Sequence, residues 1–206
     1  MSVKVKICGI TNLDDALAAV EAGTDALGFM FCESSPRNVS LTTAADIIRR
    51  LPPFIARVGV FVNPAGELVK SAIASCGVDT LQFHGEETPE FCRRFGLKTI
   101  KAFRMQGKET LGGVREYATD AWLLDSFVAG VRGGTGATFH WELAVEAKKL
   151  GRPIILAGGL TPKNVAEAVQ QVRPYAVDVS SGVESSPGKK DHGKVREFIV
   201  AATSAG

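Results

Sequence analysis

Two side chains that can transfer protons stand at the ends of short β-rich runs. Cys8 ends the first run and is followed by Gly9, which leaves space beside the sulfur, and Asp125 ends the sixth. A thiolate base and a protonated carboxyl group suit an isomerisation that moves a proton α to an imine or a carbonyl group. Lys6 shares the strand face of Cys8, so we expect it to lower the thiol pKa toward neutrality, as a general base requires.

The spacing of cysteines and histidines disfavours a covalent hydrolase and a metal site. Of the three histidines only His84 lies near the end of a β-rich run, so no Ser–His or Cys–His arrangement is evident. The four cysteines form no C-x-x-C and have no His pair at ligand spacing, which predicts free thiols and no metal. Cys76 and Cys92 fall in helical stretches and are expected to be small buried hydrophobes, whereas Cys32 lies beyond its strand.

Two glycine-containing segments are candidates for binding a phosphate group. Their backbone N–H groups can approach an anion closely, although glycines also serve tight turns, which is the alternative interpretation. The candidate groups are those of Gly158, Gly159, Ser180, Ser181 and Gly182. Arg37 follows Pro36 after the second β-rich run, and its guanidinium is suited to bidentate binding of a second anionic group, a carboxylate.

The elements that must position these residues alternate regularly between strand-like and helix-like segments. Helix-start and helix-stop signals predict helices over 13–22, 44–51, 65–76 and 163–172, the last with Pro162 at its first position. The β-rich runs are Val3–Cys8, Asp25–Phe31, Phe54–Val62, Asp79–His84, Lys98–Phe103, Ala121–Asp125, Pro153–Ala157 and Tyr175–Ser180.

Eight strand–helix units at about 26 residues each favour an α/β fold, a single (β/α)8 TIM barrel over residues 1–206. An open sheet of eight strands is the alternative. In a barrel the active site lies at the C-terminal ends of the strands, and phosphate is often bound after strands 7 and 8. The longest expected loop is Ser126–His140, which contains a Gly-Gly-Thr-Gly sequence.

Strand parity predicts which polar side chains face the barrel interior, because neighbouring residues point to opposite faces. One interpretation is a polar plug that satisfies its own hydrogen bonds. The other, which the position of these residues at strand ends favours, is a functional cluster with shifted pKa values. The inward residues predicted in this way include Lys6, Cys8, Gln82, His84, Asp125 and Asp178, and we expect Lys101 to approach the same interior.

Composition narrows the class of protein further. The chain has 206 residues, a formal net charge of +2 and 45% hydrophobic residues, so it lacks the broad basic field of a nucleic-acid binder. No apolar run approaches the roughly 20 residues that span a bilayer, and the N-terminus has no signal-peptide core. These features predict a cytoplasmic protein with no nucleic-acid or membrane partner.

The ordered set of motifs resembles the N-(5'-phosphoribosyl)anthranilate isomerase family of tryptophan biosynthesis over nearly the whole chain. The segments that carry this resemblance are Lys6-Ile7-Cys8-Gly9-Ile10-Thr11, Ser35-Pro36-Arg37, Leu81-Gln82-Phe83-His84-Gly85-Glu86, Leu124-Asp125-Ser126, Gly133-Gly134-Thr135-Gly136, Ala157-Gly158-Gly159-Leu160, Asp178-Val179-Ser180-Ser181-Gly182-Val183-Glu184 and Pro187-Gly188-Lys189-Lys190-Asp191. Two positions depart from the family pattern, His140 after the glycine loop and Asn38 beside Arg37.

The resemblance implies an aldose–ketose isomerase that performs an Amadori rearrangement without a metal or a cofactor. The implied product is 1-(2-carboxyphenylamino)-1-deoxyribulose 5-phosphate. Asp125 would be the general acid, Cys8 the general base, and Arg37 the residue that binds the anthranilate carboxylate. Gln82, His84 and Asp178 would contact the substrate, with Asp178 on the sugar hydroxyls, and the phosphosugar–anthranilate substrate would be the partner of a monomer or homodimer.

Four rival interpretations fit the sequence less well. Indole-glycerol-phosphate synthase requires a catalytic lysine near strand 2, and ribulose-phosphate epimerase requires histidine and aspartate metal ligands at the strand ends. Neither pattern is present in this sequence. An isomerase that also serves histidine biosynthesis should show two similar halves, but only the C-terminal half carries the glycine pair. A non-catalytic sensor of phosphorylated ligands would have no need of both Cys8 and Asp125.

Overall fold

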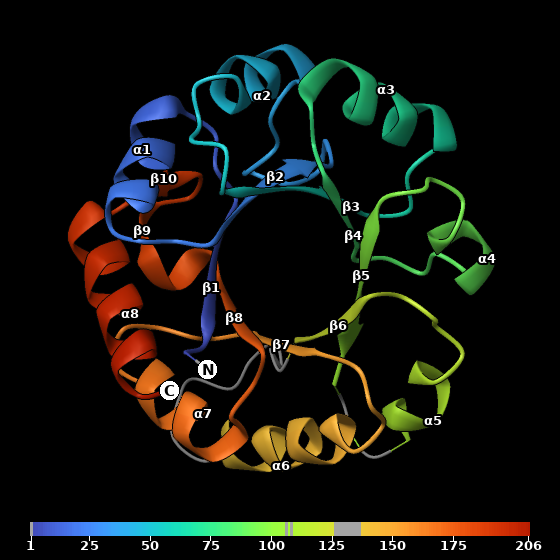
Figure 1. The fold of residues 1–206 in the computed structure, drawn as a ribbon, viewed down its shortest axis with the longest axis vertical. Coiled ribbons are helices and arrows are strands. Elements are labelled where there is room, and N and C mark those ends of the chain that lie inside the picture. Colours follow the sequence, from blue (N-terminus) through green and yellow to red (C-terminus); the bar gives the residue numbers. More distant parts are fainter. Residues whose placement is uncertain (1, 106, 108, 126–136) are drawn as a thin grey trace.

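A closed barrel of eight parallel strands forms the centre of the molecule (Figure 1). The computed structural model describes residues 2–105, 107, 109–125 and 137–206. The strands pair in chain order, and β1 and β8 close the barrel. Their bounds are β1 Lys4–Cys8, β2 Ala26–Phe31, β3 Ala56–Phe61, β4 Thr80–Phe83, β5 Lys98–Arg104, β6 Ala121–Asp125, β7 Ile154–Ala157 and β8 Ala176–Val179.

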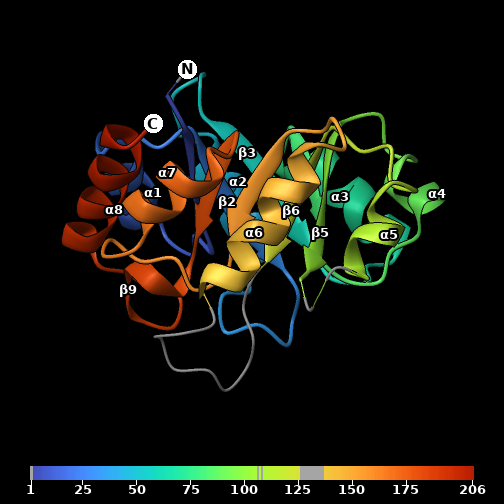
Figure 2. The same ribbon diagram turned by 90° about the horizontal axis from the view of Figure 1, so that it is seen from below.

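Helices surround the barrel as an outer ring (Figure 1). After β8 the chain forms the 3-10 turn η1, Ser181–Val183, and the hairpin β9–β10, Glu184–Ser186 and Lys189–Lys190. Figure 2 shows β9 at the end of the barrel opposite to both chain termini. The helices are α1 Leu13–Glu21, α2 Leu41–Ile48, α3 Gly66–Cys76, α4 Pro89–Cys92, α5 Thr110–Val114, α6 Ala137–Lys148, α7 Val165–Val172 and α8 His192–Ser204.

The closed topology confirms the predicted (β/α)8 barrel and shows that the alternative of an open sheet is wrong. The predicted strands are confirmed with bounds that differ by at most a few residues. Of the expected loop Ser126–His140, positions 126–136 lie outside the described residues, and the remaining four begin α6.

Two apolar clusters occupy the two faces of the strands. The outward face packs against the helices and includes Val5, Ile7 and Val177, as parity predicts. The inward face forms a smaller cluster that includes the thiol of Cys8. Its members are Cys8, Val58, Val60, Ile100, Ala102, Ala121, Leu123, Ile155, Ala157 and Ala176. The barrel is therefore filled by side chains, and its polar groups lie among apolar neighbours.

Lys101 does not face the barrel interior, so that part of the prediction is wrong. In β5 the inward positions are taken by Ile100 and Ala102, which leaves Lys101 on the helix-facing side. There its ammonium group is buried and donates to the carbonyl oxygen of Gly85 at 2.6 Å and to the carboxylate of Glu87 at 3.1 Å. Lys101 therefore supports the segment that follows β4, behind the cavity wall.

Two predicted helix starts are also wrong, at α2 and at α7. Helix α2 begins at Leu41 because the Ser40 side chain accepts from the backbone N–H of Thr43. Helix α7 begins at Val165, so Pro162 precedes it. The Asn164 side chain instead accepts from the backbone N–H of Thr161 at 2.7 Å and shapes the turn before the helix.

Candidate active site

One cavity of about 350 Å³ lies at the C-terminal ends of the barrel strands. Its wall contains all eleven residues that the sequence analysis assigned to catalysis or to ligand binding. The lining residues are Cys8, Met30, Arg37, Val60, Gln82, His84, Asp125, Ala157, Gly158, Gly159, Leu160, Asp178, Val179, Ser180, Ser181 and Gly182. This location is the one that the barrel fold uses for active sites.

Cys8 lines this cavity, beside a buried ion pair. The Lys6 ammonium and the Asp178 carboxylate are 2.8 Å apart, and their residues face each other across the β1–β8 pairing. Gly28 on β2 makes room for this group, because a Cβ at that position would lie 2.7 Å from the Cys8 sulfur and 3.2 Å from the Lys6 Nζ. The pairing of Lys6 with Asp178 offsets the cost of burying both charges.

The pKa of Cys8 is shifted in the direction opposite to the one predicted from sequence. Burial raises the pKa of the thiol, and the Asp178 carboxylate adds to the rise. The ammonium groups of Lys6 and Lys190 lower it by a smaller amount. The pKa of Lys6 itself is raised: burial lowers it, but Asp178 and Cys8 together outweigh burial. In the free protein Cys8 is therefore mostly a neutral thiol at neutral pH.

This shift predicts that Cys8 titrates above pH 9.0, the ordinary value of its thiol. Since a raised pKa favours the protonated form, the thiolate should accumulate only as the pH rises past that value. The measurement is the ultraviolet absorbance of thiolate against pH, taken as the difference between the wild-type protein and Cys8→Ser. A midpoint below pH 8 would mean that the two ammonium groups outweigh burial.

Asp125 shares the cavity with a pair of side chains from β4 and the residue after it. The Nε2 of His84 lies 3.3 Å from Oδ2 of Asp125, and the Nδ1 of His84 lies 3.2 Å from the amide nitrogen of Gln82. The two ring nitrogens of His84 therefore link the Gln82 amide on one side to the Asp125 carboxyl group on the other. Gln82 thus contacts His84, His84 contacts Asp125, and all three residues line the cavity.

The two glycine-containing segments meet at one side of the cavity. Gly158 and Gly159 adopt φ values of +84° and +64°, which side chains rarely adopt. A Cβ at Gly182 would lie 1.9 Å from the carbonyl oxygen of Leu160, so only glycine allows the two segments to touch. Asn164 donates to the carbonyl oxygen of Gly159 at 3.0 Å and so fixes the first segment from the helix side.

Two buried polar atoms in the cavity wall have no hydrogen-bond partner among the described residues. They are Oε1 of Gln82 and Oγ of Ser180. Buried polar groups are normally hydrogen-bonded, so an orphaned pair in one cavity indicates groups that a polar ligand would satisfy. Lys6 and Asp178 satisfy each other as a polar plug would, whereas these two atoms have no partner in the described part of the chain.

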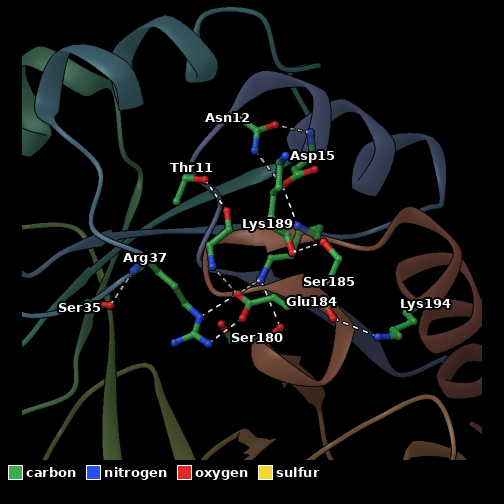
Figure 3. A network of polar contacts seen from close by, with 12 residues as sticks. Thr11, Asn12, Asp15, Ser35, Arg37, Ser180, Glu184, Ser185, Lys189 and Lys194 are labelled. Atoms are coloured by element: carbon green, nitrogen blue, oxygen red, sulfur yellow. Dashed lines mark hydrogen bonds and ion pairs between the residues drawn. The ribbon is translucent and has the colours of Figure 1, made fainter.

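Arg37 reaches the cavity rim with one edge of its guanidinium already bound. Its Nε and Nη2 each lie 2.7 Å from an oxygen of Glu184 (Figure 3). Neither Glu184 nor Lys190 is among the predicted catalytic or binding residues, although both belong to the family motifs. Their contacts join segments far apart in the chain, 147 residues in the case of Arg37 and Glu184, and no periodic pattern signals such a contact.

The described residues contain no group of three or more His, Cys, Asp and Glu side chains placed to hold a metal ion. Nor does any helix in the described part of the chain have the length and apolarity needed to cross a membrane. All four cysteines are free, and Cys76 and Cys92 are buried as expected. The cavity itself presents the thiol of Cys8, the carboxyl groups of Asp125 and Asp178, and the nitrogen donors of Arg37, Gln82 and His84.

A closed barrel whose strand ends hold a thiol, a carboxyl group and two glycine segments around one cavity is typical of barrel enzymes that act on small phosphorylated ligands. The family model for N-(5'-phosphoribosyl)anthranilate isomerase matches residues 5–201. The chain therefore belongs to the N-(5'-phosphoribosyl)anthranilate isomerase family and is an isomerase of tryptophan biosynthesis.

Named relatives and solved structures agree with this assignment over the full chain. The isomerase of Geobacter metallireducens is 56% identical over 200 residues, covering 97% of this chain and 98% of the relative. That of Trichlorobacter lovleyi is 54% identical over 203 residues, covering 98% and 99%. The crystal structure of phosphoribosyl anthranilate isomerase from Thermotoga maritima has a TM-score of 0.92 and 44% identity, and 98% of this chain and 99% of that one are covered.

Proposed function

We propose that this chain converts N-(5'-phosphoribosyl)anthranilate to 1-(2-carboxyphenylamino)-1-deoxyribulose 5-phosphate, with Asp125 as general acid and Cys8 as general base. The observation that carries the proposal is the single cavity, which presents a thiol, a carboxyl group, a guanidinium and two glycine segments together. The barrel of residues 1–206 would perform the whole reaction as one domain.

The first step uses Asp125 to open the sugar ring. Its protonated carboxyl group gives a proton to the ring oxygen while the bond between that oxygen and C1′ breaks. The electron pair of the anthranilate nitrogen forms the Schiff base in the same step. His84, whose Nε2 faces Asp125 at 3.3 Å, fixes the orientation of this acid and can exchange a proton with it.

The second step uses Cys8 to remove the proton from C2′. The electrons of that C–H bond move toward the iminium nitrogen and give an enolamine, which tautomerises to the ketone. The raised pKa makes the thiolate scarce at neutral pH but also a stronger base toward a carbon-bound proton. The ammonium groups of Lys6 and Lys190 stabilise the thiolate when it forms, because both lower the pKa of Cys8.

The remaining cavity residues would hold the substrate. The phosphate would be bound by backbone groups of the two glycine segments, and the orphaned Ser180 hydroxyl lies beside them. Gln82, His84 and Asp178 would contact the sugar, and Arg37 the anthranilate carboxylate. One solved relative, 42% identical with a TM-score of 0.89, is a complex with reduced 1-(o-carboxyphenylamino)-1-deoxyribulose 5-phosphate, and 98% of this chain and 99% of that chain are covered.

Growth of a bacterial strain that lacks this isomerase tests the proposed function. Expression of the chain should restore growth on medium without tryptophan, and the Asp125→Asn variant, expressed to the same level, should not. Failure of the wild-type chain to restore growth, with folded protein present in the cells, would contradict the proposal.

The assembly and location of the protein are further proposals. A solved relative from Thermotoga maritima, 40% identical, is described as a monomeric variant of a dimeric enzyme. Of the two states that the sequence allows, we propose a homodimer, so light scattering should give twice the chain mass of 21.8 kDa. Cell fractionation should place the protein in the cytoplasm.

A further inference from the structure

The carboxylate of Glu184 binds the side-on edge of the Arg37 guanidinium, which is the edge formed by Nε and Nη2. Nε donates to Oε1 and Nη2 donates to Oε2, both at 2.7 Å, which is a bidentate ion pair. The Glu184 side chain is 5% exposed and that of Arg37 is 22% exposed. Figure 3 shows the arginine reaching from the segment after β2 toward the glutamate after β8. The pair therefore joins two separate segments at the cavity rim.

The pairing leaves the end-on edge of the Arg37 guanidinium, formed by Nη1 and Nη2, available to a ligand. A guanidinium carries five N–H donors, and Glu184 takes one from Nε and one from Nη2. Within the described part of the chain no acceptor takes Nη1, and Arg37 lines the cavity. Nη1 together with the second hydrogen of Nη2 forms a planar fork that matches the two oxygens of a carboxylate.

Glu184 is itself held rigidly. The Lys190 Nζ, on a side chain with 0% exposure, lies 3.1 Å from Oε1 of Glu184 and also donates to the carbonyl oxygen of Ser180 at 3.2 Å. The backbone N–H of Lys190 donates to the carboxylate of Asp15 at 2.8 Å, which ties the hairpin to α1. Burial raises the pKa of Glu184, but Arg37 and Lys190 outweigh it, and the pKa is lowered. The glutamate is therefore charged at neutral pH.

The hairpin also contacts the segment that carries the arginine. Gly188 has a φ of +78°, and a Cβ there would lie 3.0 Å from the carbonyl oxygen of Pro36. The hydroxyl of Thr11 donates to the carbonyl oxygen of Gly188 at 2.6 Å. Arg37 is consequently fixed through its own side chain and through the backbone next to it. A fork held in this way loses little side-chain entropy when a ligand binds.

We propose that Glu184 is a positioning residue for substrate recognition, which aims the end-on fork of Arg37 at the carboxylate of the aromatic ring. This inference rests on the proposed function. Arg37, Glu184 and Lys190 together carry one net positive charge, which one carboxylate neutralises. Without Glu184 the guanidinium would keep its charge but would lose the fixed plane that allows two parallel hydrogen bonds.

Binding of two ligands that differ only in the carboxylate tests this role. The first is reduced 1-(o-carboxyphenylamino)-1-deoxyribulose 5-phosphate, and the second is the same compound without the carboxyl group. In the wild-type protein, measured by titration calorimetry, the first should bind at least about tenfold more tightly, since two charge-assisted hydrogen bonds to the carboxylate are stronger than neutral ones. In Glu184→Gln this preference should fall to less than about threefold, with the affinity for the second ligand unchanged.

Two further variants keep the result unambiguous. Glu33→Gln removes an exposed acid of the same segment after β2 and should keep the full preference. Arg37→Lys keeps the charge without the fork, so it should lose the preference as Glu184→Gln does, and combining the two changes should cause no further loss.

Three results would overturn the inference. The first is that Glu184→Gln keeps the wild-type preference for the carboxylated ligand. The second is that it weakens the binding of both ligands by the same factor, as loss of a purely structural residue would. The third is that Glu184→Gln reduces the preference as strongly in the Arg37→Lys protein as in the wild-type protein. A wild-type protein that binds neither ligand would contradict the proposed function as well, so the two failures are distinguishable.

Discussion

Replacing Asp125 by asparagine should lower kcat by about 100- to 10,000-fold, the range that a positioned general acid contributes. Asparagine keeps the shape of the side chain and can still accept from the Nε2 of His84, which lies 3.3 Å from the native carboxylate. It has no acidic proton to give to the ring oxygen. The effect should therefore fall on kcat, with KM changed by less than about threefold. The loss of anthranilate-type fluorescence as substrate is consumed measures both constants.

A matched substitution separates this effect from a general loss of charge. Asp46 is an exposed aspartate on α2 that pairs with Arg49. Asp46→Asn should keep kcat within about twofold of the wild-type value, because a surface ion pair contributes little. If Asp125→Asn were as active as Asp46→Asn, the acid of this reaction would have to be another group.

Replacing Cys8 by serine should have an effect of similar size, again on kcat. The hydroxyl occupies nearly the same space but ionises far less readily than a thiol, so the base that removes the C2′ proton would be lost. Because the site is a packed cluster rather than an open surface, with Gly28 against the sulfur, the rest of the cavity should keep its shape. The same fluorescence assay gives the result, and the fall in kcat should again be about 100- to 10,000-fold.

Cys32 provides the control for this substitution. It directly follows β2 and is partly exposed, and its sulfur lies 3.3 Å from the hydroxyl oxygen of Ser34. Cys32 is not among the residues that line the cavity. Cys32→Ser should leave kcat unchanged within about twofold, as surface substitutions usually do. Near-normal turnover by Cys8→Ser would remove the thiol from the role of base.

Strand periodicity was sufficient to predict the barrel and most of its inward side chains. The alternation in β1 and β8 placed Cys8 and Asp178 on one face, and the structure shows them there around the same buried lysine. The prediction for Lys101 was wrong because Ile100 and Ala102, its neighbours in β5, take the inward positions. A lysine in a strand can therefore be assigned to the barrel interior only when the faces of the residues on either side of it are known.

The features that could not be predicted depend on contacts between distant segments or on a balance of opposing effects. The partner of Arg37 comes from the far end of the chain, and the sequence around either residue does not specify it. The thiol pKa was expected to fall because Lys6 is near, but the degree of burial decides the direction, and burial is a property of the whole barrel. The turn before α7 depends on the Asn164 side chain, which accepts from the backbone N–H of Thr161 three residues earlier.

The most direct test of the catalytic account is the reaction itself in deuterated buffer. Purified wild-type protein should consume N-(5'-phosphoribosyl)anthranilate in proportion to protein concentration, and nuclear magnetic resonance should show solvent deuterium at C1′ of the product. That label is expected because the C2′ proton leaves to Cys8 and the enolamine takes its new proton from an exchangeable source. Substrate loss no faster than in buffer alone, or a product whose C2′ hydrogen has moved directly to C1′ without any deuterium, would contradict it.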